Sequence, residues 1–242
     1  SKKEVVGYES LEELNQSAPD AVNLDSLEKP AEIADTATGA MPSLANSEGR
    51  HAVAKSVADH LIGGGKFDTI IQARKFISEL TGEKIEAATD AAKRADEAIE
   101  LGVVIASRDI VQAARKQGRS DQVIFDRLMG IYEAQPSLNV RDSVSLRNQA
   151  YSTPVPLAFL ASRLARVTPQ KLAGEPTAGN GALMMEADPK TSTVNEIQDD
   201  RLEALKSQGF TPTQNDAAAM QFKPKSLDSM VMNPPFGAVN GQ

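Results

Sequence analysis

Helical periodicity dominates the chain from residue 49 to about residue 135. Val53, Val57 and Leu61 recur at helical spacing, and the glycines at residues 63–65 break the pattern. Apolar positions then resume at the same spacing, at Phe67, Ile70, Ile71, Ile77 and Leu80. Each run predicts a helix that buries one apolar side.

An alanine-rich helical stretch follows over residues 84–117, with Gly102 as a candidate interruption and Gly118 as its end. Ser120 is then placed to cap a last helix. The apolar side of that helix carries Val123, Ile124, Leu128 and Ile131. We therefore expect an all-α helical domain over residues 49–140 that packs as a bundle of its own.

Short apolar runs with polar ends replace this pattern after about residue 150. Residues 171–183, KLAGEPTAGNGAL, predict a short strand, the acid Glu175 at its end, and a glycine-bearing turn that leads into a helix. Residues 192–210 predict a second strand that ends at Glu196, followed by a helix whose Leu202 and Leu205 face the sheet.

Two further strands are expected before the chain ends. The third ends near Asp216, and residues 227–232, LDSMVM, form the fourth. Proline cannot donate to a sheet ladder, so the fourth strand stops at Asn233. The acids, the glycine turn and Asn233 then all fall at the carboxyl ends of successive strands, which is the edge where open α/β sheets bind ligands.

Charge and composition narrow the functional classes. Residues 1–48 hold ten acids and three bases, and the remaining residues hold 23 of each, so this first segment is expected to be an acidic flexible linker or arm. The chain has no cysteine and only His51 and His60, which argues against disulfides, a cysteine nucleophile and a metal site. No apolar run is long enough for a membrane span, so we expect a cytoplasmic protein without membrane partners.

Residues 148–237 resemble the N6-adenine DNA methyltransferases that use S-adenosylmethionine. Four motifs carry the resemblance: NQAYSTP at residues 148–154, EPTAGNGA at residues 175–182, the acids at Glu196 and Asp216, and NPPF at residues 233–236. The modification subunits of restriction systems, which are similar, also place a helical domain before these motifs. Gly174 departs from the family's apolar first strand, and the chain has four of the family's seven strands.

The resemblance implies an α/β fold, a truncated Rossmann-like methyltransferase sheet over residues 141–242 that follows the helical domain. It implies a catalytic NPPF tetrad and a site for S-adenosylmethionine. The implied catalytic residues are Asn233, Pro234, Pro235 and Phe236. The implied cofactor-binding residues are Tyr151, Ser152, Thr153, Pro154, Glu175, Thr177, Gly179, Asn180, Gly181, Glu196, Ile197, Asp216 and Ala217.

The chemistry of adenine methylation suits the residues of the tetrad. The amino nitrogen of adenine is a weak nucleophile because its lone pair is delocalised into the ring. The side-chain carbonyl of Asn233 and the backbone carbonyl of Pro234 can accept hydrogen bonds from this amino group, and Phe236 can stack on the base. The adenine would be flipped out of duplex DNA to reach them.

Two other functions stay open at this point. One is methylation of RNA or protein, and the other is a non-catalytic module that binds S-adenosylmethionine within a larger protein. The chain lacks an initial methionine and ends shortly after NPPF, so we expect a piece of a longer protein that does not turn over alone. Its partners would be DNA and either its own C-terminal part or a specificity or helicase subunit, as in phage antirestriction proteins that join a methyltransferase to a helicase.

Overall fold

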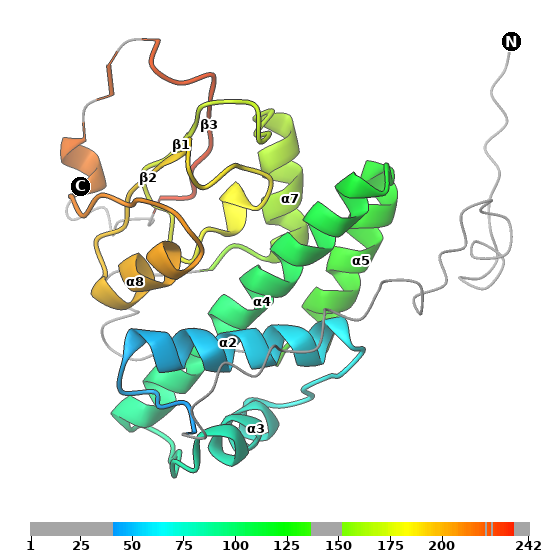
Figure 1. Cartoon of the computed structure of the whole chain (residues 1–242), viewed down its shortest axis with the longest axis vertical. Coiled ribbons are helices and arrows are strands. Elements are labelled where there is room, and N and C mark those ends of the chain that lie inside the picture. Colours follow the sequence, from blue (N-terminus) through cyan, green and yellow to red (C-terminus); the bar gives the residue numbers. More distant parts are fainter. Residues whose placement is uncertain (1–40, 137–151, 221, 224, 235–242) are drawn as a thin grey trace, which may run out of the picture. The chain divides into compact units, whose positions relative to one another are not determined.

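A computed structural model of the chain describes residues 41–136, 152–220, 222–223 and 225–234 (Figure 1). Contacts divide the chain into two units, Ser1–Ala40 and Met41–Gln242, and every described residue belongs to the second. The expected acidic arm therefore lies outside the described residues as far as residue 40. The expected boundary at residue 140 lies outside them as well.

Helix α2 (Ser47–Ile62) begins slightly before the expected residue 49, because Asn46 caps it. The Oδ1 atom of Asn46 accepts a hydrogen bond of 2.7 Å from the backbone amide of Gly49. Val53, Val57 and Leu61 are buried on one side, as their spacing predicts, and the helix ends at the expected glycines.

Helix α3 (Ile70–Thr81) is capped by Thr69 and ends at Gly82, which adopts the left-handed conformation at φ 68°. Ile77 is buried in its core-facing side, but Ile71 is 75% exposed and contributes nothing to that side. Phe67 is buried just before the helix begins, where its ring stacks on His60 at 4.6 Å between ring centroids.

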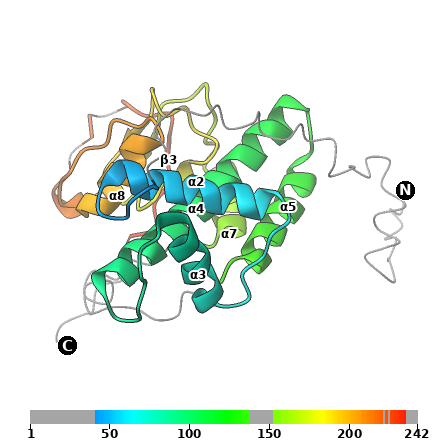
Figure 2. The ribbon, with the colours of Figure 1, turned by 60° about the horizontal axis from the view of Figure 1, so that its bottom comes forward.

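Helix α4 (Asp90–Lys116) runs without a break through Gly102, so the expected interruption there is wrong. Gly102 lies where α4 crosses α2 (Figure 2). A Cβ atom at this position would lie 2.7 Å from the carbonyl oxygen of Ala54 and 2.7 Å from the side chain of Val57. The glycine therefore allows the two helices to approach closely.

Helix α5 (Asp121–Ala134) begins at the expected cap, since the hydroxyl of Ser120 accepts a hydrogen bond from the amide of Val123. Ile124, Leu128 and Ile131 are buried, as predicted. α5 then packs against α7 (Val155–Leu164), which has Pro156 in its first turn.

Three short parallel strands form the described sheet, in the order β2-β1-β3. They are β1 (Ala173–Glu175), β2 (Thr193–Val194) and β3 (Ser229–Met230). Where the third strand was expected, Thr213 forms a single parallel bridge with Asn195. Asp216, near which that strand was expected to end, is the N-cap of the 3-10 helix η3 (Ala217–Ala219).

The glycine turn after β1 leads only into the 3-10 helix η2 (Ala182–Met184), where a longer helix was expected. The chain has to turn back to β2 within a few residues, and it does so at Asp188. The amides of Thr191 and Ser192 both donate to the carbonyl of Asp188. After β2, α8 (Asp199–Ser207) forms as predicted, with Leu202 and Leu205 buried.

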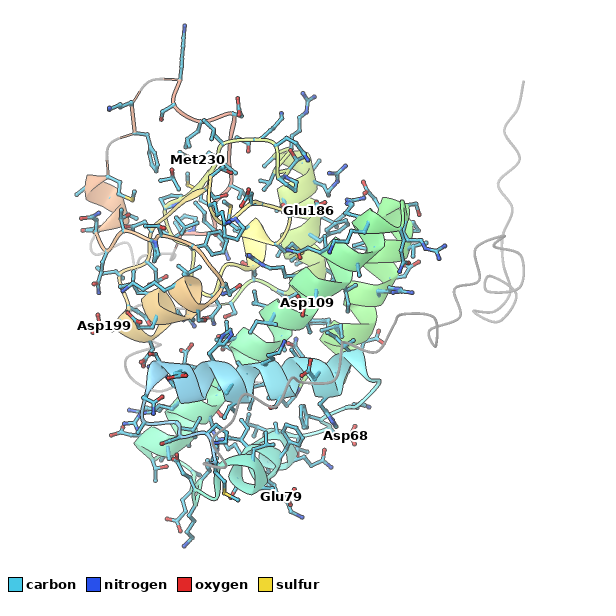
Figure 3. All side chains as sticks on the ribbon, in the orientation of Figure 1. Asp68, Glu79, Asp109, Glu186, Asp199 and Met230 are labelled. Atoms are coloured by element: carbon cyan, nitrogen blue, oxygen red, sulfur yellow. The ribbon has the colours of Figure 1, made fainter. Side chains whose placement is uncertain are left out.

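One hydrophobic core joins the helices of residues 47–134 to the sheet. Ile99 and Val103 of α4 belong to the same buried cluster as Phe159 of α7, Met184 and Leu205. Figure 3 shows Glu186 beside α4, where its carboxylate pairs with the guanidinium of Arg115 at 2.8 Å. The helices and the sheet thus share one core.

The side of α7 that faces away from this core is also apolar. Leu157, Leu160 and Leu164 lie on it at helical spacing and are 57%, 42% and 85% exposed.

Candidate functional site

The sheet topology places the polar residues expected from the sequence along one edge. The strands are parallel, so their carboxyl ends lie at the same edge of the sheet. β1 ends at Glu175, Glu196 lies two residues after β2, and Asn233 lies three residues after β3. These three side chains define the sheet-edge site.

Glu175 is the most deeply buried acid of this site, with 2% of its surface exposed. Its Oε2 atom has no hydrogen-bond partner among the described residues. Burial raises the pKa of Glu175 well above its ordinary value, and the nearby carboxylate of Glu196 raises it further. Burying a carboxyl oxygen without a hydrogen-bond partner costs free energy. A ligand that donates a hydrogen bond to this oxygen would recover part of that cost.

Glu196 is also buried and holds the glycine turn against β2. Its Oε2 atom accepts a hydrogen bond of 2.8 Å from the amide of Gly179, and its Oε1 atom accepts one of 2.8 Å from the amide of Gln198. A carboxylate offers about four acceptor positions, and the bonds from described residues take up two of them.

The turn between β1 and η2 needs its two glycines for their backbone conformation. Gly179 and Gly181 have φ of 55° and 83°, in the left-handed region that side chains disfavour. Thr177, in the same turn, has a buried hydroxyl without a partner in the described part of the chain. Asn180 lines a small cavity between α2, α4 and α8, of about 20 Å³, which is room for one water.

Asn195 organises the site, and sequence reasoning missed it. Its Nδ2 atom donates to the carbonyls of Pro176 at 3.0 Å and Asn215 at 2.9 Å. Its Oδ1 atom accepts from the hydroxyl of Thr213 at 2.8 Å and from the amide of Asn215 at 2.9 Å. The sequence does carry a signal, because Asn195 stands between the apolar Val194 and the acid Glu196. A buried asparagine at the end of a strand has to find hydrogen-bond partners.

Three other residues that were expected to bind the cofactor are more exposed than Glu175 and Glu196. Asp216 is exposed, and its Oδ1 atom accepts from the amide of Ala218 at 2.9 Å, so one carboxylate oxygen is engaged as a cap. Ala217 opens the 3-10 helix that this cap begins. The side chain of Ile197 is 58% exposed beside the site.

Asn233 is linked to the segment of residues 152–154 that precedes α7. Its Nδ2 atom donates a hydrogen bond of 2.9 Å to the hydroxyl of Thr153. Pro154 is the N-cap residue of α7, and Pro234 is exposed directly after Asn233. Tyr151, Pro235 and Phe236, which were also predicted as site residues, lie outside the described residues.

A cluster of acidic and basic side chains on α4 and α8 contacts the segment of residues 152–154. The hydroxyl of Ser152 donates to Oε2 of Glu100 on α4 at 2.5 Å. Arg201 of α8 contacts both Glu100, at 3.1 Å, and Glu97, at 3.3 Å. Burial and the nearby Glu97 raise the pKa of Glu100 to about 7, although Arg201 acts in the opposite direction. Sequence reasoning missed this cluster because Arg201 lies 101 residues from Glu100 and 104 from Glu97.

The hydrogen-bond acceptors of the sheet-edge site favour a particular ligand chemistry. It presents the carboxyl groups of Glu175 and Glu196, with Asp216 further along the chain, and the basic side chain of Arg201 lies close to Glu196 and to the glycine turn. Carboxylates accept from hydroxyl and amino groups and attract positive charge, but they repel phosphate. Among the described residues no group of three or more histidine or acidic side chains is arranged to hold a metal ion.

Comparison with known proteins adds no relative: no family model matches the chain, and no curated protein and no solved structure is significantly similar to it. In the described part of the chain, no helix is both long enough and apolar enough to cross a membrane.

Proposed function

We propose that this chain is the methyl-transfer part of an S-adenosylmethionine-dependent enzyme that modifies the N6 amino group of adenine in DNA. The observation that supports this most is the common position of Glu175, Glu196 and Asn233 at the carboxyl edge of three parallel strands. The order β2-β1-β3, extended beyond β2 by the bridge to Thr213, is also the order of the first four strands of a Rossmann-like sheet.

The cofactor-binding residues fit S-adenosylmethionine in their chemistry. Glu196 would accept hydrogen bonds from the two ribose hydroxyls, because the bonds from described residues take up two of its about four acceptor positions. Asp216 would accept from the adenine amino group, and residues 151–154 would cover the methionine end. Glu175, buried and lacking a partner at Oε2, would accept from the cofactor's cationic amino group.

When bound, S-adenosylmethionine supplies an electrophilic methyl group, and the chain's own residues orient the acceptor nitrogen. The Nδ2 atom of Asn233 is engaged by Thr153, which leaves Oδ1 to accept from the adenine amino group. The backbone carbonyl of Pro234 would accept the second amino hydrogen, and Phe236 would stack on the base. Such positioning directs the nitrogen lone pair toward the methyl group and needs no strong base.

The biological setting is part of the same proposal. An adenine in a duplex would have to flip out of the stack to reach Asn233. The helical region would guide DNA or a partner subunit, as in restriction-modification or phage antirestriction systems. This assignment rests on the resemblance of residues 148–237, since fold and position alone do not establish function.

Two measurements test the proposal. Calorimetry should detect binding of S-adenosylmethionine, and methyl transfer should be assayed on unmodified DNA, RNA and protein with this chain and with longer versions of the protein that contain it. We expect transfer to adenine in DNA that is lost with Asn233→Ala. Transfer to RNA or protein instead would redirect the substrate assignment. Binding without transfer in any version would favour the cofactor-binding module.

A further inference from the structure

Side-chain contacts and one backbone link connect the helical region to Asn233. Arg201 holds Glu100, Glu100 accepts from the hydroxyl of Ser152, and the neighbouring Thr153 accepts from Nδ2 of Asn233. Consecutive Cα atoms are fixed about 3.8 Å apart, so a displacement of Ser152 carries Thr153 with it. The position of the Thr153 hydroxyl thus depends on a residue in α4.

We infer that Glu100 is a positioning residue that holds the side chain of Asn233 in place through Ser152 and Thr153. Its role in methyl transfer rests on the proposed function, but the contacts themselves do not. An asparagine amide can present either its oxygen or its nitrogen to a substrate, and only the oxygen accepts a hydrogen bond from an amino group. In the structure Nδ2 donates to the Thr153 hydroxyl, so holding this hydroxyl in place also holds the side chain of Asn233.

Glu97 provides a contrast within the same cluster. Both acids lie on α4 and both contact Arg201, at 3.3 Å for Glu97 and 3.1 Å for Glu100. Only Glu100 accepts from Ser152. A role in neutralising Arg201 would be shared by the two acids, whereas a role in positioning Asn233 belongs to Glu100.

The test follows the side-chain amide of Asn233 directly, by nitrogen-15 NMR on the chain, with the signal assigned by its loss in Asn233→Asp. In the parent, the hydrogen bond to Thr153 slows exchange of these amide protons with water. We expect Glu100→Ala, Ser152→Ala and Thr153→Val to speed this exchange by about two- to tenfold, the factor that one hydrogen bond of ordinary strength is worth.

Conservative variants should behave like the parent. Glu100→Gln keeps a side-chain carbonyl for Ser152, Thr153→Ser keeps the hydroxyl, and Glu97→Gln changes the same ion-pair cluster without touching Ser152. Unchanged exchange in both Glu100→Ala and Ser152→Ala would overturn the inference, as would equal effects of Glu97→Gln and Glu100→Ala. If Glu100→Ala fails to fold, Ser152→Ala decides the result alone.

The NMR result stands whether or not the chain transfers methyl groups, so the inference and the proposed function can fail separately. Where methyl transfer is detected, Glu100→Ala should lower kcat on the order of ten- to a hundredfold, because misplacing a reacting group by about 1 Å has that effect. The KM for S-adenosylmethionine should change much less, and Glu100→Gln should restore kcat.

Discussion

The carboxylate of Glu196 accepts a hydrogen bond of 2.8 Å from the backbone amide of Gly179, so the acid after β2 and the glycine turn after β1 form one rigid unit. Glu196 is buried and Gly179 has a positive φ that glycine adopts readily, so a buried acceptor holds a turn that its glycine allows. A ligand that binds at this edge therefore meets a turn that is already in place.

Replacing Glu196 with alanine should weaken binding of S-adenosylmethionine by about 1.5 to 3 kcal/mol, the contribution of hydrogen bonds to a charged group. The loss would combine the missing acceptors for the ribose hydroxyls with a less ordered glycine turn. Calorimetry on the chain measures it.

Glu79→Ala is the matched control, because Glu79 is an exposed acid on α3 that pairs with Lys75. It should leave the affinity unchanged. An affinity of Glu196→Ala equal to that of the parent would show that this acid does not bind the cofactor.

Asn195→Ala should destabilise the protein by about 2 to 4 kcal/mol. Four hydrogen bonds of the side chain would be lost, and the buried carbonyl of Pro176 would lose the donor that Asn195 gives it. Chemical denaturation measures the change in free energy of unfolding. Gln214→Ala, which removes an exposed amide beside the same turn, should cost less than about 0.5 kcal/mol, and similar losses for both variants would contradict the role of Asn195.

Local signals in the sequence were enough to place most helices. Ser120 was predicted as a cap and caps α5, whereas Asn46, Thr69 and Thr89, which cap the three helices before it, were not singled out. The end of α4 next to Gly118 could be read for the same reason, since a glycine with positive φ stops a helix without help from distant residues.

Tertiary contacts account for what the sequence did not reveal. Gly102 was taken as a break because glycine weakens an isolated helix, but the close crossing with α2 outweighs that weakness. The expected third strand is reduced to one bridge, because the side chain of Asn195 forms hydrogen bonds with the amide and the carbonyl of Asn215. Glu100 and Arg201 could not be paired from the sequence, because nothing local indicates a contact over such a separation.

Two glycine substitutions within helices should have opposite effects on stability. Gly102→Ala should destabilise the protein by about 1 to 3 kcal/mol, because the new Cβ would lie 2.7 Å from backbone and side-chain atoms of α2. Gly130→Ala in α5 should stabilise it by about 0.5 to 1 kcal/mol, because no described atom lies within 4 Å of the new Cβ and alanine favours a helix. Thermal and chemical unfolding of the two variants would test the crossing, and a neutral Gly102→Ala would contradict it.

The pH dependence of stability should carry the signature of Glu100. The folded protein raises the pKa of this carboxyl from 4.5 to about 7, through burial first and then through Glu97, with Asp96 adding to the effect and Arg201 and Ser152 opposing it. Between these two pH values the folded state binds a proton that the unfolded state has released. The stability that Glu100 contributes is therefore fully present below about pH 4.5 and is lost as the pH rises through 7.

Glu100→Gln removes this titration while keeping an acceptor for Ser152. Relative to the parent, the variant should gain stability between pH 5 and pH 8, by on the order of 1 to 3 kcal/mol, since one pKa unit corresponds to about 1.4 kcal/mol. Unfolding curves across this range measure the difference in free energy of unfolding between the two proteins. Glu175 and Asp109 also have raised pKa values, but both proteins contain them, so their contributions cancel in the difference. Glu79→Gln, at an exposed acid on α3, should leave the pH profile of the parent unchanged. A constant difference between Glu100→Gln and the parent at every pH would show that Glu100 titrates near its ordinary pKa in the folded protein.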